Sequence, residues 1–357
     1  MSLKPPAKTV GSEANTCLAP LRVVFAVTEV GEEAAAGDVF TAMELGAALA
    51  ERFGWQVDYR PQGDAWYALA SVDVVIAMVD DFDPRCIHGS HPGLVRVAWA
   101  RNWFERWYER DWWGAFDLYL ASSQLSARYV SSRAGKLAHI LRIGTNPQRF
   151  NIEGRQPVPT LDYVFTGSYW GSDRDVASAL GALPMRLRGA IYGKGWHAHP
   201  HLARLDKGFV RYAYLPDVYR RAAIVIDDAN HVTKAWGAAN SRVFDALAAG
   251  CLVITNSESV SMDAFDGELP VYRSNDDLVQ LVSHYASDHK SRADLQERLR
   301  RFVLAKHCYS HRAFEFGLYL ERYLTRERSK SGVEQLLTKM RSPSKLTLAA
   351  PLRFAAK

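Results

Sequence analysis

The sequence predicts an α/β fold in which two Rossmann-like domains face each other across a cleft. Short apolar, β-branched segments alternate with helical segments twice along the 357 residues, as in doubly wound parallel sheets. A polar, Pro-containing stretch at 151–160 separates the two series. A chain of this length with 48% hydrophobic residues is able to form two cores of ordinary size.

The first series of elements defines an N-terminal Rossmann-like domain at 21–145, after a flexible N-terminus at 1–20. Its expected strands are 22–27, 56–59, 72–78, 94–99, 118–121 and 139–143. A helix at 39–52 follows the first strand, and Ser122-Ser123 is expected to cap the helix after the fifth strand.

The second series defines a C-terminal Rossmann-like domain at 161–310, after a linker at 146–160. Its expected strands are 161–166, 186–192, 223–227 and 252–255, and its later helices are 275–288, 291–306 and 312–325. We expect the C-terminal helix at 311–326 to pack back towards the first domain, and 327–357 to form a basic tail.

The most informative segment runs from Asn240 to Asn256 and reads as a loop, a short helix, a tight turn and a buried strand. Asn240 or Ser241 is able to cap the helix, so that its first N–H groups and the positive end of its dipole form an anion site suited to a diphosphate. Arg242 adds a cation there, and Asp245, three residues on, lies on the same helical face, where it would accept hydrogen bonds from a ribose diol.

This segment resembles the donor site of GT-B glycosyltransferases, in particular the group-1 and CgeB-like families, in which an Arg-Val-Phe-Glu-Ala segment precedes a Gly. Asp245 stands where the family usually has Glu, which moves the carboxylate back by one methylene. The first acidic residue of the wider Glu-x7-Glu pattern falls on Gly237, so this contact is either absent or supplied by another residue, for which Lys234 is our candidate. The resemblance implies a GT-B fold in which the domain at 161–310 binds a nucleotide-sugar donor and the domain at 21–145 forms the acceptor side.

Two glycine-containing turns add candidates for donor binding. Gly167 and Ser168 close the first strand of the second domain, where backbone is able to approach a phosphate or an acceptor closely. Lys194 lies between two glycines at the end of the next strand, in a loop where the family resemblance puts base or phosphate contacts. The alternative for each turn is an ordinary strand-to-helix connection.

Catalysis in such enzymes needs a group on the acceptor side of the cleft. Asp38 is our candidate for the base that takes the acceptor proton, with Glu29, Glu32 and Glu33 as weaker alternatives; Asp38 fits a helix N-cap equally well. If the reaction retains configuration, Asp38 would only position the acceptor.

Three tryptophans at four-residue spacing, Trp99, Trp103 and Trp107, predict one aromatic helical face, which is more often core than ligand site. Arg101 and Asn102, at the start of that helix, are candidates for acceptor binding.

The sequence gives little reason to expect a metal or a cofactor. The Asp81-Phe82-Asp83 spacing is that by which GT-A transferases hold a divalent cation, but it lies far from the donor segment, and the four cysteines form no Cys-x-x-Cys pair. We therefore expect a metal-independent enzyme without a cofactor.

The net charge of +5 is concentrated at the C-terminus. Residues 326–357 carry eight basic and two acidic side chains, so the other 325 residues sum to −1, and the absence of a basic stripe argues against nucleic-acid binding. The tail either contacts an anionic membrane peripherally or is a disordered end without a core-forming pattern. No apolar run reaches about 18 residues and no signal-peptide core is present, which favours a cytoplasmic protein, at the inner face of the membrane if the tail binds there.

The sequence therefore predicts a transferase that moves a hexosyl or deoxyhexosyl group from a nucleoside-diphosphate sugar to a glycan or lipid-linked acceptor. By family analogy alone, its role is in bacterial surface-polysaccharide or lipopolysaccharide biosynthesis. The alternatives are a GT-B-like nucleotide-sugar epimerase and a non-catalytic nucleotide- or glycan-binding protein.

Overall fold

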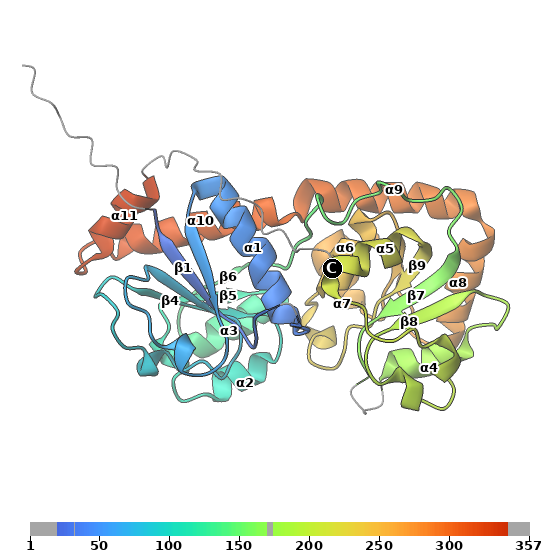
Figure 1. The fold of residues 1–357 in the computed structure, drawn as a ribbon, viewed down its shortest axis with the longest axis horizontal. Coiled ribbons are helices and arrows are strands. Elements are labelled where there is room, and N and C mark those ends of the chain that lie inside the picture. Colours follow the sequence, from blue (N-terminus) through green and yellow to red (C-terminus); the bar gives the residue numbers. More distant parts are fainter. Residues whose placement is uncertain (1–19, 32, 170–173, 342–357) are drawn as a thin grey trace, which may run out of the picture.

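The computed structural model describes residues 20–31, 33–169 and 174–341, and Figure 1 shows two α/β units side by side. A six-stranded sheet with the order β2-β1-β3-β4-β5-β6 forms the first unit, and a four-stranded sheet with the order β10-β9-β7-β8 forms the second. Neighbouring strands are parallel in both sheets. The predicted fold class is confirmed.

The first sheet agrees with the predicted strands to within a few residues. Its strands are β1 (Arg22–Ala26), β2 (Gln56–Arg60), β3 (Val74–Ala77), β4 (Val95–Ala100), β5 (Leu118–Ala121) and β6 (Ala138–Ile140), and its helices are α1 (Gly37–Phe53), α2 (Phe104–Glu109) and α3 (Gln124–Ala134). Ser123 caps α3 by accepting a hydrogen bond from the Ser126 N–H at 3.1 Å, which the run of two serines predicts.

The second sheet also follows the predicted pattern. Its strands are β7 (Leu161–Thr166), β8 (Gly189–Tyr192), β9 (Ala222–Ile226) and β10 (Leu252–Ile254). The helices are α4 (Asp175–Ala182), α5 (Leu215–Arg220), α6 (Ser241–Ala248), α7 (Glu258–Phe265), α8 (Asn275–Ser287), α9 (His289–Lys306), α10 (Tyr309–Arg326) and α11 (Val333–Arg341).

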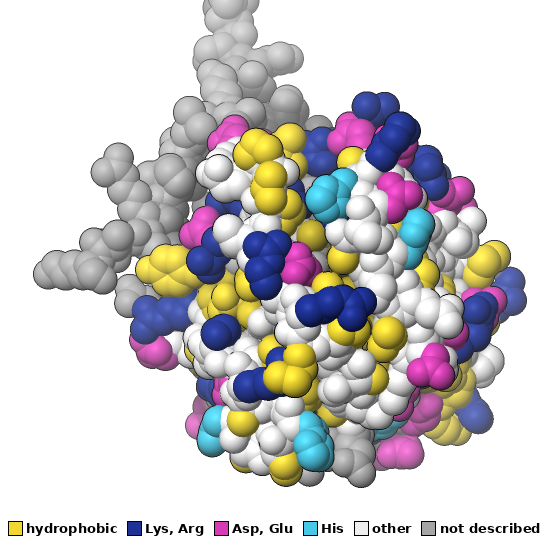
Figure 2. All heavy atoms as spheres, turned by 90° about the vertical axis from the view of Figure 1, so that its right-hand side faces the viewer, with side chains coloured by type: hydrophobic (Ala, Val, Ile, Leu, Met, Phe, Trp, Pro, Cys, Tyr) yellow, Lys and Arg dark blue, Asp and Glu magenta, His cyan; other side chains and the backbone are white. Residues whose placement is uncertain are grey.

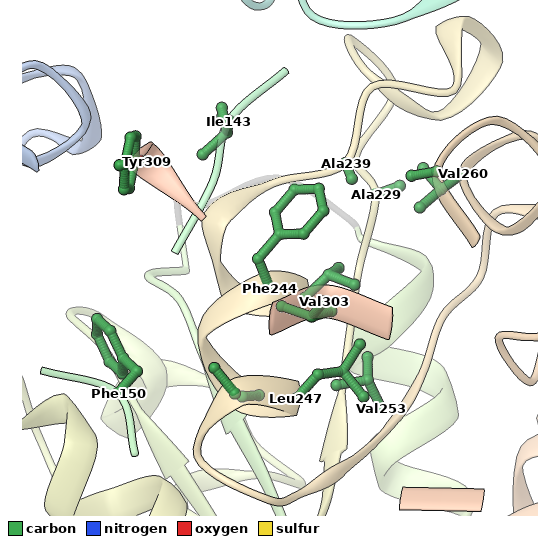
Figure 3. Packing of buried hydrophobic residues seen from close by; sticks show 14 of the residues in the cluster. Ile143, Phe150, Ala229, Ala239, Phe244, Leu247, Val253, Val260, Val303 and Tyr309 are labelled. Carbon is green, nitrogen blue, oxygen red and sulfur yellow. The ribbon is translucent and has the colours of Figure 1, made fainter. Parts of the chain in front are cut away.

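Helix α6 is held in place by the core of the second unit. Figure 3 shows Phe244 and Leu247 of this helix among buried aliphatic side chains, with Val253 of β10 and Val303 of α9 close by. All four of these side chains are fully buried. Because they pack against one another, the direction of the α6 axis, and therefore of its N-terminus, is fixed.

The single aromatic helical face predicted for the tryptophan repeat is wrong. Trp99 lies in β4, Trp103 precedes α2 and only Trp107 is helical. A strand and a short helix bring Trp99 and Trp107 into the core, where they are 0% and 2% exposed. Because four-residue spacing is ambiguous between these structures, the periodicity did not reveal the break at Arg101 and Asn102.

The prediction that the C-terminal tail lacks a core-forming pattern is wrong for 333–341. These residues form α11, in which Val333, Leu336 and Leu337 are buried. Lys339 reaches the buried carboxylate of Asp73, with 2.9 Å between Nζ and Oδ1. The apolar side of this helix is therefore used for packing within the protein; residues 342–357 and 1–19 lie outside the described residues.

The chain passes between the two units twice, at Thr145 and at Cys308, and the two crossings are hydrogen-bonded to each other. The Thr145 N–H donates to the His307 carbonyl at 2.8 Å, and the Tyr309 N–H donates to the Thr145 carbonyl at 2.9 Å. After this crossing α10 runs back over the first unit and packs against α1.

His307 supports this double crossing as a neutral imidazole. Its Nε2 donates to the Ala264 carbonyl at 3.0 Å, and its Nδ1 accepts from Arg312 at 2.6 Å. Burial, reinforced by the Arg312 cation, lowers the pKa of His307 to about 3.

The depressed pKa of His307 predicts an acid-sensitive fold. Between pH 6.5 and about 3 the unfolded chain binds a proton at this residue that the folded chain does not, so the free energy of unfolding falls by up to about 1.4 kcal/mol per pH unit as the pH drops. Urea denaturation at pH 7 and pH 5 measures this slope. His307→Gln should reduce it, and exposed His284→Gln should not; equal slopes in all three proteins would contradict the assignment.

Candidate functional site

A cleft of about 360 Å³ lies between the two units. Ala35, Gly37, Phe40, Thr41 and Asn102 line it from the first unit. Most of its wall comes from the second unit, through residues that follow β7, β8 and β9 or begin α6. This is the carboxyl edge of the second sheet, where parallel α/β sheets bind ligands.

A buried ion pair between Arg242 and Asp227 organises the wall of the cleft. Asp227 directly follows β9 and is 0% exposed, and its Oδ1 lies 2.8 Å from Arg242 Nη1. The same oxygen accepts from Asn240 Nδ2 at 2.8 Å, and Oδ2 accepts from the Thr255 hydroxyl at 2.8 Å. One carboxylate thus connects β9, the residue after β10, and the start of α6.

The predicted cap of α6 is confirmed, and Asn240 is the capping residue. Its side-chain oxygen accepts from the Arg242 N–H at 3.1 Å, while Ser241 is the first helical residue. Both line the cleft, so the positive end of the α6 dipole is directed at the cavity.

Arg242 lines the cleft and is held there by contacts of its Nε, its Nη1 and the face of its guanidinium. Nε donates to the Thr166 carbonyl at 2.6 Å, Nη1 pairs with Asp227, and the guanidinium lies 4.8 Å from the Phe165 ring centroid. Nη2 lies where a β-carbon on Gly167 would come within 2.9 Å of it. Gly167 therefore keeps this nitrogen accessible.

The two glycine turns meet at the end of the second sheet. A β-carbon on Gly193 would lie 2.1 Å from the Gly167 carbonyl oxygen, so the close approach of the turns requires glycine. The Lys194 N–H donates to the Ser168 hydroxyl at 3.1 Å. Gly167 and Ser168 line the cleft.

The two predicted lysines lie outside the residues that line the cleft. Lys194 is exposed, with its Nζ 5.0 Å from the ring centroid of Phe209, which does line the cleft. Lys234 is paired with Asp175 at 2.7 Å.

Arg174 and Asp228 are functional candidates that the sequence reasoning missed. Arg174 Nη2 lies 2.6 Å from Asp228 Oδ2, and its Nη1 donates to the Ser168 carbonyl at 2.7 Å. Both residues line the cleft. Two acidic residues directly after an apolar run were a usable signal for Asp227 and Asp228, whereas no spacing pattern pointed to Arg174.

Asp245 lies at the bottom of the cleft, beside the crossing between the units. Its Oδ1 accepts from the Thr145 hydroxyl at 2.7 Å, and it is 2% exposed. Burial, with a smaller contribution from the nearby Glu44 carboxylate, raises the pKa of Asp245 well above its usual range.

Glu44 of α1 lies near Asp245 and contacts both the linker and the second unit. It accepts from Arg149 at 2.7 Å, from Asn146 Nδ2 at 2.6 Å and from the Tyr212 hydroxyl at 3.3 Å. The Tyr212 ring stacks on Phe40 with 4.4 Å between centroids. Tyr212 lines the cleft and was also missed by the sequence reasoning.

Asp38 and Arg101 lie close together beneath the first-unit side of the cleft. Asp38 is in the first turn of α1 and accepts from the Thr28 N–H at 2.6 Å; the N-cap of this helix is Ala36. Burial lowers the pKa of Arg101, partly offset by the Asp38 charge, and Arg101 Nη2 donates to the Met78 carbonyl at 3.2 Å. Of the first-unit candidates, only Asn102 lines the cleft.

The glutamates of the neighbouring loop have structural partners. Glu29 accepts from the Ala35 and Ala36 N–H groups at 2.5 and 2.6 Å, which lowers its pKa. Glu33 pairs with Arg211 of the second unit at 2.5 Å. Glu32 lies outside the described residues.

The Asp-x-Asp pair is occupied by arginines. Asp81 pairs with Arg110, and Asp83 pairs with Arg85 at 2.8 Å. Within 20–31, 33–169 and 174–341, no group of three or more His, Cys, Asp or Glu residues is arranged to hold a metal ion.

Comparisons with known proteins agree with this architecture. Residues 174–316 match a family model described as glycosyl transferase-like. No curated protein matches the sequence. Among solved structures, AviGT4, a glycosyltransferase involved in avilamycin A biosynthesis, is similar with 15% identity and a TM-score of 0.53, over 85% of this chain and 97% of that one.

Two further structures share the fold. T4 phage BGT in complex with UDP-glucose has 11% identity and a TM-score of 0.56, over 84% of this chain and 99% of that one. An S. aureus TarM variant in complex with fondaparinux, α-GlcNAc-glycerol and UDP has 10% identity and a TM-score of 0.51, over 75% of this chain and 55% of that one. The architecture is the GT-B fold. The match to the glycosyl transferase-like family covers residues 174–316, and both this match and the fold agree with the donor-site resemblance.

The Arg242–Asp227 pair predicts a large stability loss when one partner is removed. Arg242→Ala leaves a fully buried carboxylate uncompensated, which costs about 3–5 kcal/mol of unfolding free energy. Chemical denaturation measures the loss. Arg273→Ala is the matched control, because its pair with Glu258 is exposed and contributes at most about 1 kcal/mol; similar losses in both variants would contradict the role of the buried pair.

The raised pKa of Asp245 predicts the opposite pH dependence to that of His307. Above pH about 4 the unfolded chain loses a proton that folded Asp245 retains, so its contribution to stability declines as the pH rises towards the folded pKa. Asp245→Asn should remove this decline while keeping an acceptor for the Thr145 hydroxyl. Unfolding free energies from pH 4 to 8 test this, and a steeper decline in the variant would count against it.

Proposed function

We propose that this protein transfers a hexosyl or deoxyhexosyl group from a nucleoside-diphosphate sugar to a glycan or lipid-linked acceptor, without a metal or cofactor. The capped N-terminus of α6, with Arg242 beside it at the cleft, is the observation that carries the proposal. The role that we propose, bacterial surface-polysaccharide or lipopolysaccharide biosynthesis, rests on family analogy.

In this proposal the diphosphate lies between Arg242 Nη2, the start of α6 and the turn at Gly167 and Ser168. These groups line one cavity and combine a cation with a helix dipole and closely approachable backbone. Asp245 lies deeper, in the position that we assign to the ribose. Lys194 and Lys234 lie outside the lining of the cavity. Lys194 would reach the ligand if its side chain turned away from the Phe209 ring, and Lys234 if its ion pair with Asp175 broke.

Asp38 remains our proposal for the acceptor-side base, with a condition set by its contacts. Its carboxylate has to exchange the Thr28 N–H for the acceptor hydroxyl, since the residue is 6% exposed. If the reaction retains configuration, Asp38 holds the acceptor loop and the leaving phosphate accepts the proton. In that case the Arg101 cation interacts with the Asp38 carboxylate, and Asn102 contacts the acceptor.

The surface features bear on partners and location. Lys and Arg are interspersed with Asp and Glu over the end of the second unit that Figure 2 shows, which argues against a nucleic-acid partner there. None of the helices in the described parts of the chain has the length and hydropathy needed to span a bilayer. We propose a cytoplasmic protein; peripheral membrane contact would rest on 342–357, because Val333, Leu336 and Leu337 of α11 are buried.

Nucleotide binding tests the donor site directly. Thermal unfolding with UDP, GDP, dTDP, CMP and ADP, each with and without EDTA, should show stabilisation by one diphosphate that EDTA does not change; a ligand at 100 times its dissociation constant adds about 2.7 kcal/mol. Arg242→Lys keeps a charge beside Asp227 but loses Nη2, so it should reduce the shift, whereas Arg273→Lys should not.

The outcomes separate the candidate functions. Sugar transfer to an acceptor supports the transferase, donor isomerisation without an acceptor indicates an epimerase, and binding without turnover indicates a binding protein. No shift with any nucleotide at millimolar concentration would contradict the donor site.

A further inference from the structure

Trp103, beside the cleft in the first unit, has an unusual backbone conformation. Asn102 lines the cleft, and the next residue, Trp103, has φ 49° and ψ 42°, in the left-handed region, as the N-cap of α2. A bulky residue there costs on the order of 1–3 kcal/mol. An indole also makes no cap hydrogen bond in this helix, so the backbone position does not explain the choice of tryptophan.

The core does not explain it either. Phe104 and Trp107, on the same short helix, are 0% and 2% exposed and fill the space beneath α2. Trp103 itself is partly exposed. Its ring is approached by Arg106, with 3.4 Å between the guanidinium carbon and the ring centroid, and edge-on by His231 at 5.6 Å.

Arg106 brings to this ring a positive charge that has no ion-pair partner among the described residues. It forms no hydrogen bond or ion pair with the residues that the structure describes, although Glu105 and Glu109 lie on the same helix. Arg110, one turn further on, is instead paired with Asp80 at 2.7 Å. Stacking of Arg106 on the indole leaves the N–H groups in the guanidinium plane available for a planar anion.

Trp103 and His231 mark the rim where the two units meet. Each follows a residue that lines the cleft, Asn102 in the first unit and Asn230 in the second. Their rings are in edge-to-face contact at this point. The indole of Trp103, with the Arg106 guanidinium stacked on it, therefore lies directly beside the cleft.

We propose that Asn102, Trp103 and Arg106 form the acceptor subsite, and that the acceptor is a saccharide carrying a carboxylate or phosphate group. The C–H face of a pyranose packs on the part of the indole that Arg106 and His231 leave uncovered, and the anionic group binds the Arg106 guanidinium. This inference rests on the proposed function and names its acceptor class.

Matched sugars test the charge preference on the full chain. Calorimetric or saturation-transfer titrations with methyl glucuronide, glucose 6-phosphate and methyl glucoside should show about tenfold tighter binding of one or both anionic sugars; the first two distinguish carboxylate from phosphate. Arg106→Gln should lower anionic-sugar affinity to that of the glucoside. Arg128→Gln, an exposed arginine of α3, is the control and should change neither.

A second variant separates ligand binding from folding. Trp103→Gly suits the positive φ, so we expect thermal stability to be kept while affinity for all three sugars falls. Equal affinity for charged and neutral sugars, unchanged affinity in Arg106→Gln, or no sugar binding while a nucleotide still stabilises the protein, would each overturn the proposal. Failure of the proposed function appears separately, as the absence of any nucleotide shift.

Discussion

The geometry of the candidate site depends on the carboxylate of Asp227. It is fully buried and accepts hydrogen bonds from the arginine, the N-cap and the hydroxyl that surround it. Because a buried charge is tolerated only when it is paired and hydrogen-bonded, each of these partners is held in one orientation. The direction of α6 and the position of Arg242 follow from satisfying this one group.

Several contacts attach the first unit to this rigid wall. Trp236, in the loop after Asn230, packs between Phe104 and Tyr129 with centroid distances of 5.4 and 4.7 Å, and its carbonyl accepts from Ser123 at 2.5 Å. Across the floor, Glu44 contacts the linker and Tyr212. The cleft lies between these attachments, so its width depends on aromatic and hydrogen-bonded contacts between the units.

The sequence predicted the elements better than the side-chain partners. Hydrophobic alternation located both sheets, and the preference of asparagine for helix caps located the start of α6. It did not predict that Arg242 is paired beneath Gly167 or that Asp245 is buried, because these depend on contacts between residues up to 100 positions apart. The helix predicted from the tryptophan repeat was wrong for a local reason, because the three residues lie in a strand, at a left-handed position and in a helix.

The charges of the donor wall are largely balanced before any ligand arrives. Asp227 neutralises Arg242, and Asp228 neutralises Arg174. A diphosphate in this cleft would therefore be held less by net positive charge than by fixed N–H groups and the α6 dipole, which are already oriented and lose little freedom on binding. Arg106, which has no ion pair among the described residues, differs from this wall, because an exposed cation attracts anions at a distance and is screened by salt. The donor wall would therefore select its ligand through fixed hydrogen-bonding geometry, whereas the first-unit side would select its ligand through charge.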